Sequence, residues 1–173
     1  PRANAAYDIN NDKEYRLQGS MYLEWKPIKQ LTFKTNNQVE FDFVQSRQMR
    51  HEYTHQGTAT DFEYNNKDIR LTTSNTITYD DKFGDHSLRI LVGQEAMKDK
   101  FDLLGAYSPG VDPAIPYPTT GNGETDQVDF NIIEETLLSF FGVADYNYHN
   151  RYYVQASVRA DGSSLFGTKS KWG

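Results

Sequence analysis

The sequence predicts an all-β fold made of six amphipathic, antiparallel strands arranged as three hairpins. Hydrophobic residues recur with a period of two in six separate segments, and no long window shows the period of a helix. Short turns alternate with long connections that are rich in proline and glycine. With 173 residues the chain is close to the size of one domain, for which roughly 150 residues is a usual prior.

The first hairpin is predicted from strands at about 14–25 and 31–45, joined by a short turn at about 26–30. Successive side chains of a strand point to opposite faces, so each strand has one apolar and one polar face. The two apolar faces contain Tyr15, Leu17, Met21, Leu23, Trp25, Leu31, Phe33, Val39, Phe41 and Phe43. Polar residues such as Lys34 and Glu40 occupy the opposite faces.

The second hairpin is predicted from strands at about 68–80 and 86–98, with a short turn at about 81–85. The two apolar faces contain Ile69, Leu71, Ile77, Tyr79, Leu88, Ile90 and Val92. The acidic turn resembles a calcium loop only faintly, because it lacks the full ligand spacing and the closing glutamate. Gly84 explains this segment as a tight turn that needs no metal.

The third hairpin is predicted from strands at about 136–148 and 151–161, with a turn at about 149–150. The two apolar faces contain Leu138, Phe140, Ala144, Tyr146, Tyr148, Tyr152, Val154, Ala156 and Val158. The exceptions are Phe141 and Val143, which fall on the polar side. The preceding residues, from Ile132 onward, could begin a helix, and we expect at most a helical turn there.

Two long connections separate the hairpins, at about 46–67 and 99–134. The second contains four of the six prolines, which predicts an irregular loop. A loop of about 35 residues is unusual in a compact soluble domain, whereas outer-membrane barrels combine short periplasmic turns with long extracellular loops. We therefore expect the strands to belong to a transmembrane β-barrel. The chain has no run of 18 apolar residues, which excludes a transmembrane helix.

Aromatic residues recur on the apolar faces close to the three short turns. These residues are Trp25, Tyr79, Tyr146, Tyr148 and Tyr152. Amphipathic rings at one common height are typical of the girdle that marks a membrane interface. The placement therefore predicts one edge of the lipid-facing band.

The polar faces carry charged residues of both signs. They are predicted to line the barrel lumen, because Arg or Lys on the lipid side costs about 2–4 kcal/mol near the midplane. The predicted lumen-facing charged residues are Lys34, Glu40, Asp42, Arg70, Arg89, Glu95, Asp145, Arg159 and Asp161. For each of these residues, we expect pairing with a side chain on a neighbouring strand rather than ligand binding.

Composition and motifs argue against most other chemistries. The net charge of −6 argues against nucleic-acid binding, and the absence of Cys excludes disulfides and thiol nucleophiles. Residues 51–55 match the zinc motif H-E-x-x-H, which requires a helix. Gly57 and the neighbouring threonines argue against one, so we expect no metal, no cofactor and no enzymatic activity.

The last forty residues resemble the barrel of SusC/RagA-type TonB-dependent transporters. The run R-A-D-G-S-S-L-F-G at 159–167, followed by Trp172 and Gly173, is similar to the R-x-D-G-S-S-x-F-G and W-G signature of that family. The turn F-G-D-H at 83–86 and the strand segment G-Q-E-A at 93–96 are also similar to a hairpin of the family. The resemblance covers about 68–100 and 135–173 specifically.

The resemblance implies a bacterial outer-membrane importer with a 22-stranded barrel and an N-terminal plug. Such transporters take up oligosaccharides or peptides, pair with a SusD-like surface lipoprotein and receive energy from the TonB system through the plug. Neither plug nor TonB box is recognised in this sequence, and six strands cannot close a barrel. We therefore expect the chain to be a piece of a longer transporter, surrounded by outer-membrane lipid and not functional alone.

Two further expectations concern binding. If the long connections are extracellular, then Tyr53, Tyr64, Tyr107 and Tyr117 are available there to stack on sugars or to contact a partner. The alternative to a transporter is a soluble β-sandwich that binds carbohydrate or protein. Such a sandwich would bury the apolar faces against a second sheet.

Overall fold

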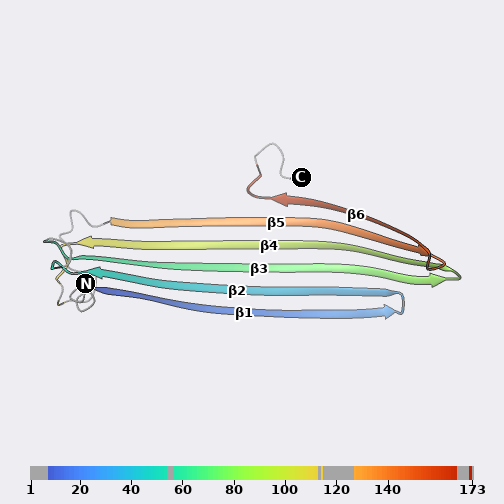
Figure 1. Cartoon of the computed structure of the whole chain (residues 1–173), viewed down its shortest axis with the longest axis horizontal. Coiled ribbons are helices and arrows are strands. Elements are labelled where there is room, and N and C mark those ends of the chain that lie inside the picture. The colour runs from blue at the N-terminus through green and yellow to red at the C-terminus, as the bar shows by residue number, and fades with distance from the viewer. Residues whose placement is uncertain (1–7, 54–56, 113, 115–126, 167–171, 173) are drawn as a thin grey trace. The chain divides into compact units, whose positions relative to one another are not determined.

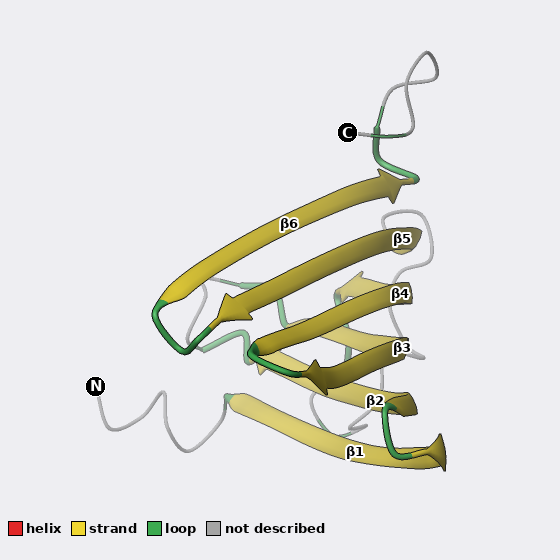
Figure 2. Ribbon diagram, turned by 90° about the vertical axis from the view of Figure 1, so that its right-hand side faces the viewer, coloured by secondary structure: helices red, strands yellow, loops and turns green. Residues whose placement is uncertain are grey.

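The structure is a computed structural model that describes residues 8–53, 57–112, 114, 127–166 and 172. The described residues form six strands and no helix (Figure 1; Figure 2, where strands are yellow). The strands are β1 (Ile9–Ile28), β2 (Leu31–Arg50), β3 (Thr60–Phe83), β4 (His86–Pro109), β5 (Gln127–Tyr148) and β6 (Tyr152–Ser163). They form one sheet in the order β1-β2-β3-β4-β5-β6, so each strand pairs with its neighbour in sequence. The predicted all-β fold of six antiparallel strands is confirmed.

The chain divides into two compact units. Unit 1 contains Pro1–Leu17, Phe41–Ile69 and Lys100–Ile133, and unit 2 contains Gln18–Glu40, Arg70–Asp99 and Glu134–Gly173. Unit 2 holds the three short turns and most of the amphipathic pattern. Unit 1 holds the remaining parts of β1 to β5.

Several strands are longer than the periodicity predicts. The structure has β3 from Thr60 instead of about 68, β4 as far as Pro109 instead of about 98, and β5 from Gln127 instead of about 136. Much of the predicted loops 46–67 and 99–134 is therefore strand, and the expected helical turn before residue 136 is part of β5. The reason is that sheet hydrogen bonds join backbone groups whatever the side chains are. In β5, Val128, Phe130 and Ile132 have the same strand parity as Leu138 and Phe140, but Glu134 and Thr136 interrupt the apolar run between them.

The turns contain residues with unusual backbone angles. His149 and Asn150 have φ of 54° and 55°, and the amide of Arg151 donates to the carbonyl of Tyr148 at 3.0 Å. Two successive positive φ angles define the type I′ turn, whose twist matches that of a hairpin. Gly84, with φ of 62°, lies in the turn between β3 and β4. Both turns therefore use geometries suited to tight antiparallel hairpins.

The register between β5 and β6 places residues of the same face opposite one another. Phe140 lies opposite Ala160, Gly142 opposite Val158, and Tyr148 opposite Tyr152. On the other face, Ser139 lies opposite Asp161 and Asp145 lies opposite Gln155. The apolar faces of the two strands therefore coincide, as do their polar faces.

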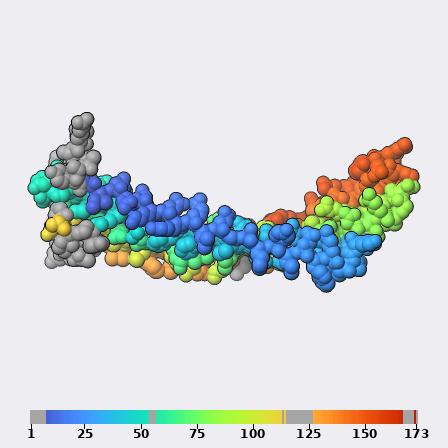
Figure 3. All heavy atoms as spheres, turned by 90° about the horizontal axis from the view of Figure 1, so that it is seen from below, coloured from blue at the N-terminus to red at the C-terminus, as the bar shows by residue number. Residues whose placement is uncertain are grey.

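The apolar face of unit 2 is uncovered. Leu23, Trp25 and Val158 are 67%, 61% and 71% exposed. A soluble sandwich would bury such residues against a second sheet, and the described residues supply one sheet alone. Every residue of the edge strand β1 is exposed as well, and its side chains are blue in Figure 3. Among the described residues, buried apolar side chains gather only in unit 1, at Met49, Ala59 and Val111.

Candidate functional site

The polar face of unit 2 carries a charged network that joins four strands. Arg70 on β3 donates to the Asp99 carboxylate on β4 at 2.6 Å and lies 3.5 Å from Glu40 on β2. Gln18 on β1 and Gln38 donate to Glu40 at 2.8 and 2.6 Å. Each strand thus contributes a side chain that pairs with the next strand, which cross-links the face.

A second network surrounds Arg159 on β6. Its guanidinium lies 2.8 Å from the Asp161 carboxylate and 3.5 Å from Glu95 on β4. The same guanidinium lies over the ring of Phe141 on β5, 5.6 Å from the ring centre, in cation–π geometry. The Phe141 ring in turn covers Gly93 on β4, where a Cβ would overlap it. These contacts explain why Phe141, an apolar residue, lies on the polar face: its ring fills the space above Gly93 and packs against Arg159.

A polar hollow of about 470 Å³ lies on the same face, close to the turns of unit 2. The residues that line it include Arg89, Asp145 and Asn147. Gln155 on β6 donates to Asp145 at 2.7 Å. Among the residues that the structure describes, Arg89 makes no ion pair.

Unit 1 contains a more buried ion pair. Arg47 on β2 donates twice to Asp61 on β3, at 2.9 and 3.4 Å, and the Asp61 side chain is 1% exposed. Arg16 on β1 lies 2.7 Å from Asp42 on β2 in the same unit. Charged pairs between neighbouring strands therefore continue beyond the amphipathic segments.

The predicted polar-face residues are mostly engaged with neighbouring side chains. Ion pairs or hydrogen bonds involve Glu40, Asp42, Arg70, Glu95, Asp145, Arg159 and Asp161. Lys34 lies 5.2 Å from the ring centre of Tyr22. Sequence reasoning did not single out Gln18, Asp99 or Phe141, because Asp99 was placed in a loop and Phe141 was counted as an exception. The contact between Phe141 and Gly93 could not be predicted without knowing the register between β4 and β5.

The tyrosines that were predicted to lie in loops do not form one cluster among the described residues. Tyr53 stacks on His51 with ring centres 4.7 Å apart and is 76% exposed. Tyr64 and Tyr107 lie in β3 and β4 and not in loops, and Tyr117 lies outside the described residues. Within the H-E-x-x-H match, Glu52 and Tyr53 form a turn and not a helix, and His55 lies outside the described residues.

The aromatic residues near the turns form contacts of their own. Trp25 stacks on Phe33 with ring centres 5.5 Å apart, and Tyr148 stacks on Tyr152 at 6.5 Å. His86 on β4 joins the second group, since its Nδ1 lies 2.6 Å from the Tyr146 hydroxyl. Tyr79 donates to Asp81 at 3.0 Å. The sequence predicted His86 at the end of the turn, and its position two residues before Leu88 places it on the apolar face of β4.

The signature motif has a structural explanation. Trp172 pairs with Gly162 in an antiparallel bridge, and its indole lies 3.2 Å from the place where a Cβ of Gly162 would stand. The indole also stacks on Phe140 at 6.0 Å. The glycine of the D-G-S-S segment therefore provides the room that the tryptophan needs.

Comparison with known proteins agrees with these observations. No family model matches the chain. TonB-dependent receptor P3 of Formosa agariphila is 27% identical over 99% of the chain, and receptor P26 of the same organism is 25% identical over 99%. The chain spans 18% of the length of each of these relatives.

Solved structures show the same fold. The RagAB peptide transporter superposes on 98% of the chain with a TM-score of 0.90 and 23% identity, over 20% of the matched chain. The siderophore receptor PiuA of Acinetobacter baumannii superposes on 96% with a TM-score of 0.57 and 13% identity, over 29% of its chain. The six strands therefore share the fold of part of each of these solved structures.

In sequence the chain is similar to part of TonB-dependent receptors, and in fold it is similar to part of the RagAB peptide transporter. The relatives are named as TonB-dependent receptors, and the RagAB structure is that of a peptide transporter. The described residues contain no helix that is long and apolar enough to cross a membrane.

Proposed function

We propose that this segment forms part of the wall of an outer-membrane importer for oligosaccharides or peptides. The observation that carries the proposal is the division of the unit 2 sheet into an exposed apolar face and a charged, cross-linked face. The apolar face suits contact with lipid, and the charged face suits a water-filled or plugged lumen. The fold shared with the RagAB peptide transporter supports the same proposal.

The segment needs further strands to act. Exposed edge strands leave unpaired backbone groups, which are costly in lipid, so a membrane-spanning sheet must close on itself. We propose that the complete transporter closes 22 strands around a plug domain that couples it to the TonB system. The segment alone supplies neither a closed pore nor that coupling.

Orientation follows from the lengths of the connections. We propose that the turns at 29–30, 84–85 and 149–151 face the periplasm and that the connections at 51–59 and 110–126 face the exterior. A SusD-like surface lipoprotein would then meet the barrel at the exterior connections, where Tyr53 is exposed. We propose that substrate passes the charged face and contacts Arg89 and the Arg159 network there.

Labelling of single cysteines tests this orientation in the complete transporter. The chain contains no Cys, so each introduced thiol in this segment reports one position. In intact cells, a membrane-impermeant maleimide should label Tyr53→Cys and should not label Asn150→Cys. Both should be labelled after the outer membrane is permeabilised. If intact cells label Asn150→Cys and do not label Tyr53→Cys, the orientation is the opposite of the one proposed.

Uptake measurements test the activity. Cells that lack the transporter should lose accumulation of either labelled oligosaccharides or labelled oligopeptides, and inactivation of TonB should cause the same loss. The class that is lost identifies the substrate. Unchanged accumulation of both classes would contradict import as the function.

A further inference from the structure

One edge of the sheet in unit 1 is formed by the first part of β5. β5 has 22 residues and β6 has 12, and the described pairing between them runs from Leu137 to Tyr148 on β5. Trp172 pairs with Gly162 near the end of β6, so the chain turns back at that level. Unit 1 contains no residue of β6, and its part of β5, residues 127–133, is therefore an edge of the described sheet (Figure 1). We name this segment the β5 edge.

The backbone groups of alternate residues in the β5 edge point away from β4. In an antiparallel sheet the N–H and C=O of one residue both point to the same neighbouring strand, and those of the next residue point to the other. Thr136 identifies the set that points away from β4, because its carbonyl accepts from the Ser164 amide and its amide donates to the Ser164 hydroxyl, each at 2.9 Å. Val128, Phe130 and Ile132 have the same parity as Thr136. Their N–H and C=O groups are therefore a template for an added strand.

The side chains of the β5 edge are exposed on both faces. Val128, Phe130 and Ile132 are 72%, 68% and 46% exposed on one face, and Asp129 and Asn131 are exposed on the other. Strand addition to a sheet edge draws its affinity from the main chain and its specificity from alternate side chains. An added strand that fits here has apolar side chains on one face and a basic side chain next to Asp129 on the other.

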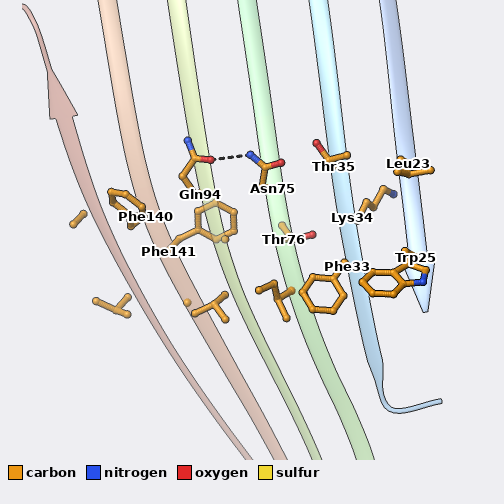
Figure 4. A pocket seen from close by; sticks show the side chains of 16 residues that line it. Leu23, Trp25, Phe33, Lys34, Thr35, Asn75, Thr76, Gln94, Phe140 and Phe141 are labelled. Carbon is orange, nitrogen blue, oxygen red and sulfur yellow. Dashed lines mark hydrogen bonds between the residues drawn. The ribbon is translucent and has the colours of Figure 1, made fainter. Parts of the chain in front are cut away.

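The largest apolar recess of the described residues has a different character. It has a volume of about 750 Å³ and lies on the apolar face of unit 2, where Trp25, Phe33 and Phe140 line it (Figure 4). A hydrogen bond of 2.8 Å from Asn75 to Gln94 crosses it. The strands β2 to β5 beneath it are paired on both sides, so the recess offers side chains alone. The β5 edge in addition offers backbone donors and acceptors, which suit a second polypeptide chain.

We propose that the β5 edge binds an extended oligopeptide substrate by strand addition. The inference rests on the proposed function, in which the connection at 110–126, directly before Gln127, faces the exterior. An oligosaccharide has no regular row of amide donors and carbonyl acceptors, so the proposal selects peptides from the two substrate classes. Asp129 and the apolar row favour peptides in which apolar and basic residues alternate.

Fluorescence anisotropy of the complete transporter in detergent tests the backbone contact. The probe is a labelled peptide of about seven residues, in which valine and lysine alternate, and the transporter should bind it. Ile132→Pro removes an N–H that does not pair with β4, a position where strands tolerate proline. The affinity should fall about tenfold, which is the effect of one good hydrogen bond. Ile132→Val keeps the N–H and is the matched control; equal affinities of the two variants would overturn the proposal.

Two methylated forms of the same peptide test whether it binds as a strand. One form is N-methylated at every second amide, and the other form at the remaining amides. Because the amides of a strand point alternately to its two sides, one form should lose binding and the other should keep it. Equal effects of the two forms would contradict strand addition.

Asp129→Lys tests the preferred charge. This variant should bind the valine–lysine peptide more weakly than the unmodified transporter does, and it should bind a peptide of alternating valine and glutamate more tightly. An unchanged preference would overturn the basic specificity. Retention of the folded, heat-modifiable band on a gel shows that each variant still forms its barrel.

Hydrogen exchange identifies any other occupant of the edge. The amides of Val128, Phe130 and Ile132 should exchange rapidly in the complete transporter and slowly after the peptide is added. Slow exchange without peptide, caused by another part of the transporter or by a co-purified lipoprotein, would overturn the proposal. Uptake of oligosaccharides without binding of the peptide would also overturn it, but it would leave import as the function of the transporter.

Discussion

The ring of Phe141 on β5 occupies the space directly above Gly93 on β4. The contact joins neighbouring strands on the charged face of unit 2, and Arg159 of β6 lies over the same ring. Three strands are thus held together by one aromatic side chain that needs a glycine beneath it. This arrangement resembles the covering of strand glycines by aromatic residues that stabilises curved sheets.

Replacement of Gly93 by Ala should destabilise the barrel by about 1–3 kcal/mol, because the new methyl group would overlap the Phe141 ring. The measurement is urea unfolding of the complete transporter in vesicles. Gly19→Ala on β1 is the matched control, since only the Val39 side chain comes near, at 3.8 Å. Adding Phe141→Leu to Gly93→Ala should restore part of the loss. Equal effects of the Gly93 and Gly19 variants would contradict the overlap.

Arg47→Met should destabilise unit 1 by about 3–5 kcal/mol, because it leaves the buried Asp61 carboxylate without its guanidinium. Combining Arg47→Met with Asp61→Leu should cost much less, since both charges are then removed. The same urea unfolding measures both variants. A double variant as unstable as the single one would mean that the pair contributes through packing and not through charge.

Arg159→Gln should weaken the coupling between β4 and β6, because Arg159 contacts both Glu95 and Asp161. The pairs are partly exposed, so the coupling should be small and should decrease as salt rises. A double-mutant cycle between Arg159→Gln and Glu95→Gln, repeated at low and high salt, measures it. Coupling that does not change with salt would contradict a mainly electrostatic interaction between Arg159 and Glu95.

Asn150→Val should destabilise the last hairpin by about 1–2 kcal/mol, because Asn150 has a φ of 55° that a β-branched residue adopts poorly. Asn150→Gly is the matched control and should be tolerated, since glycine adopts positive φ readily. Unfolding midpoints of the two variants provide the comparison. If the valine variant unfolds at the same urea concentration as the glycine variant, the turn geometry does not limit stability.

The charged face shows how far sequence reasoning reaches. Strand parity alone placed Glu40, Arg70 and Glu95 on one face, and structural pairing was the expected role for them. Parity could not say which residues meet, because the partner of a side chain depends on the register between strands. The pairing of Arg70 with Asp99, a residue assigned to a loop, therefore came only from the structure.

The amphipathic strands, the turns and the resemblance to a transporter family were determined by the sequence alone. Period-two alternation and turn composition are local properties, because they depend only on residues that are close together in the sequence. The strand extensions that begin at Thr60 and Gln127 were not, because polar residues such as Glu134 interrupt the apolar pattern and backbone pairing there depends on the neighbouring strand. Contacts such as Phe141 with Gly93 and Asn75 with Gln94 join residues 48 and 19 positions apart. Only the tertiary structure decided them, since side chains on different strands meet according to the register of the sheet.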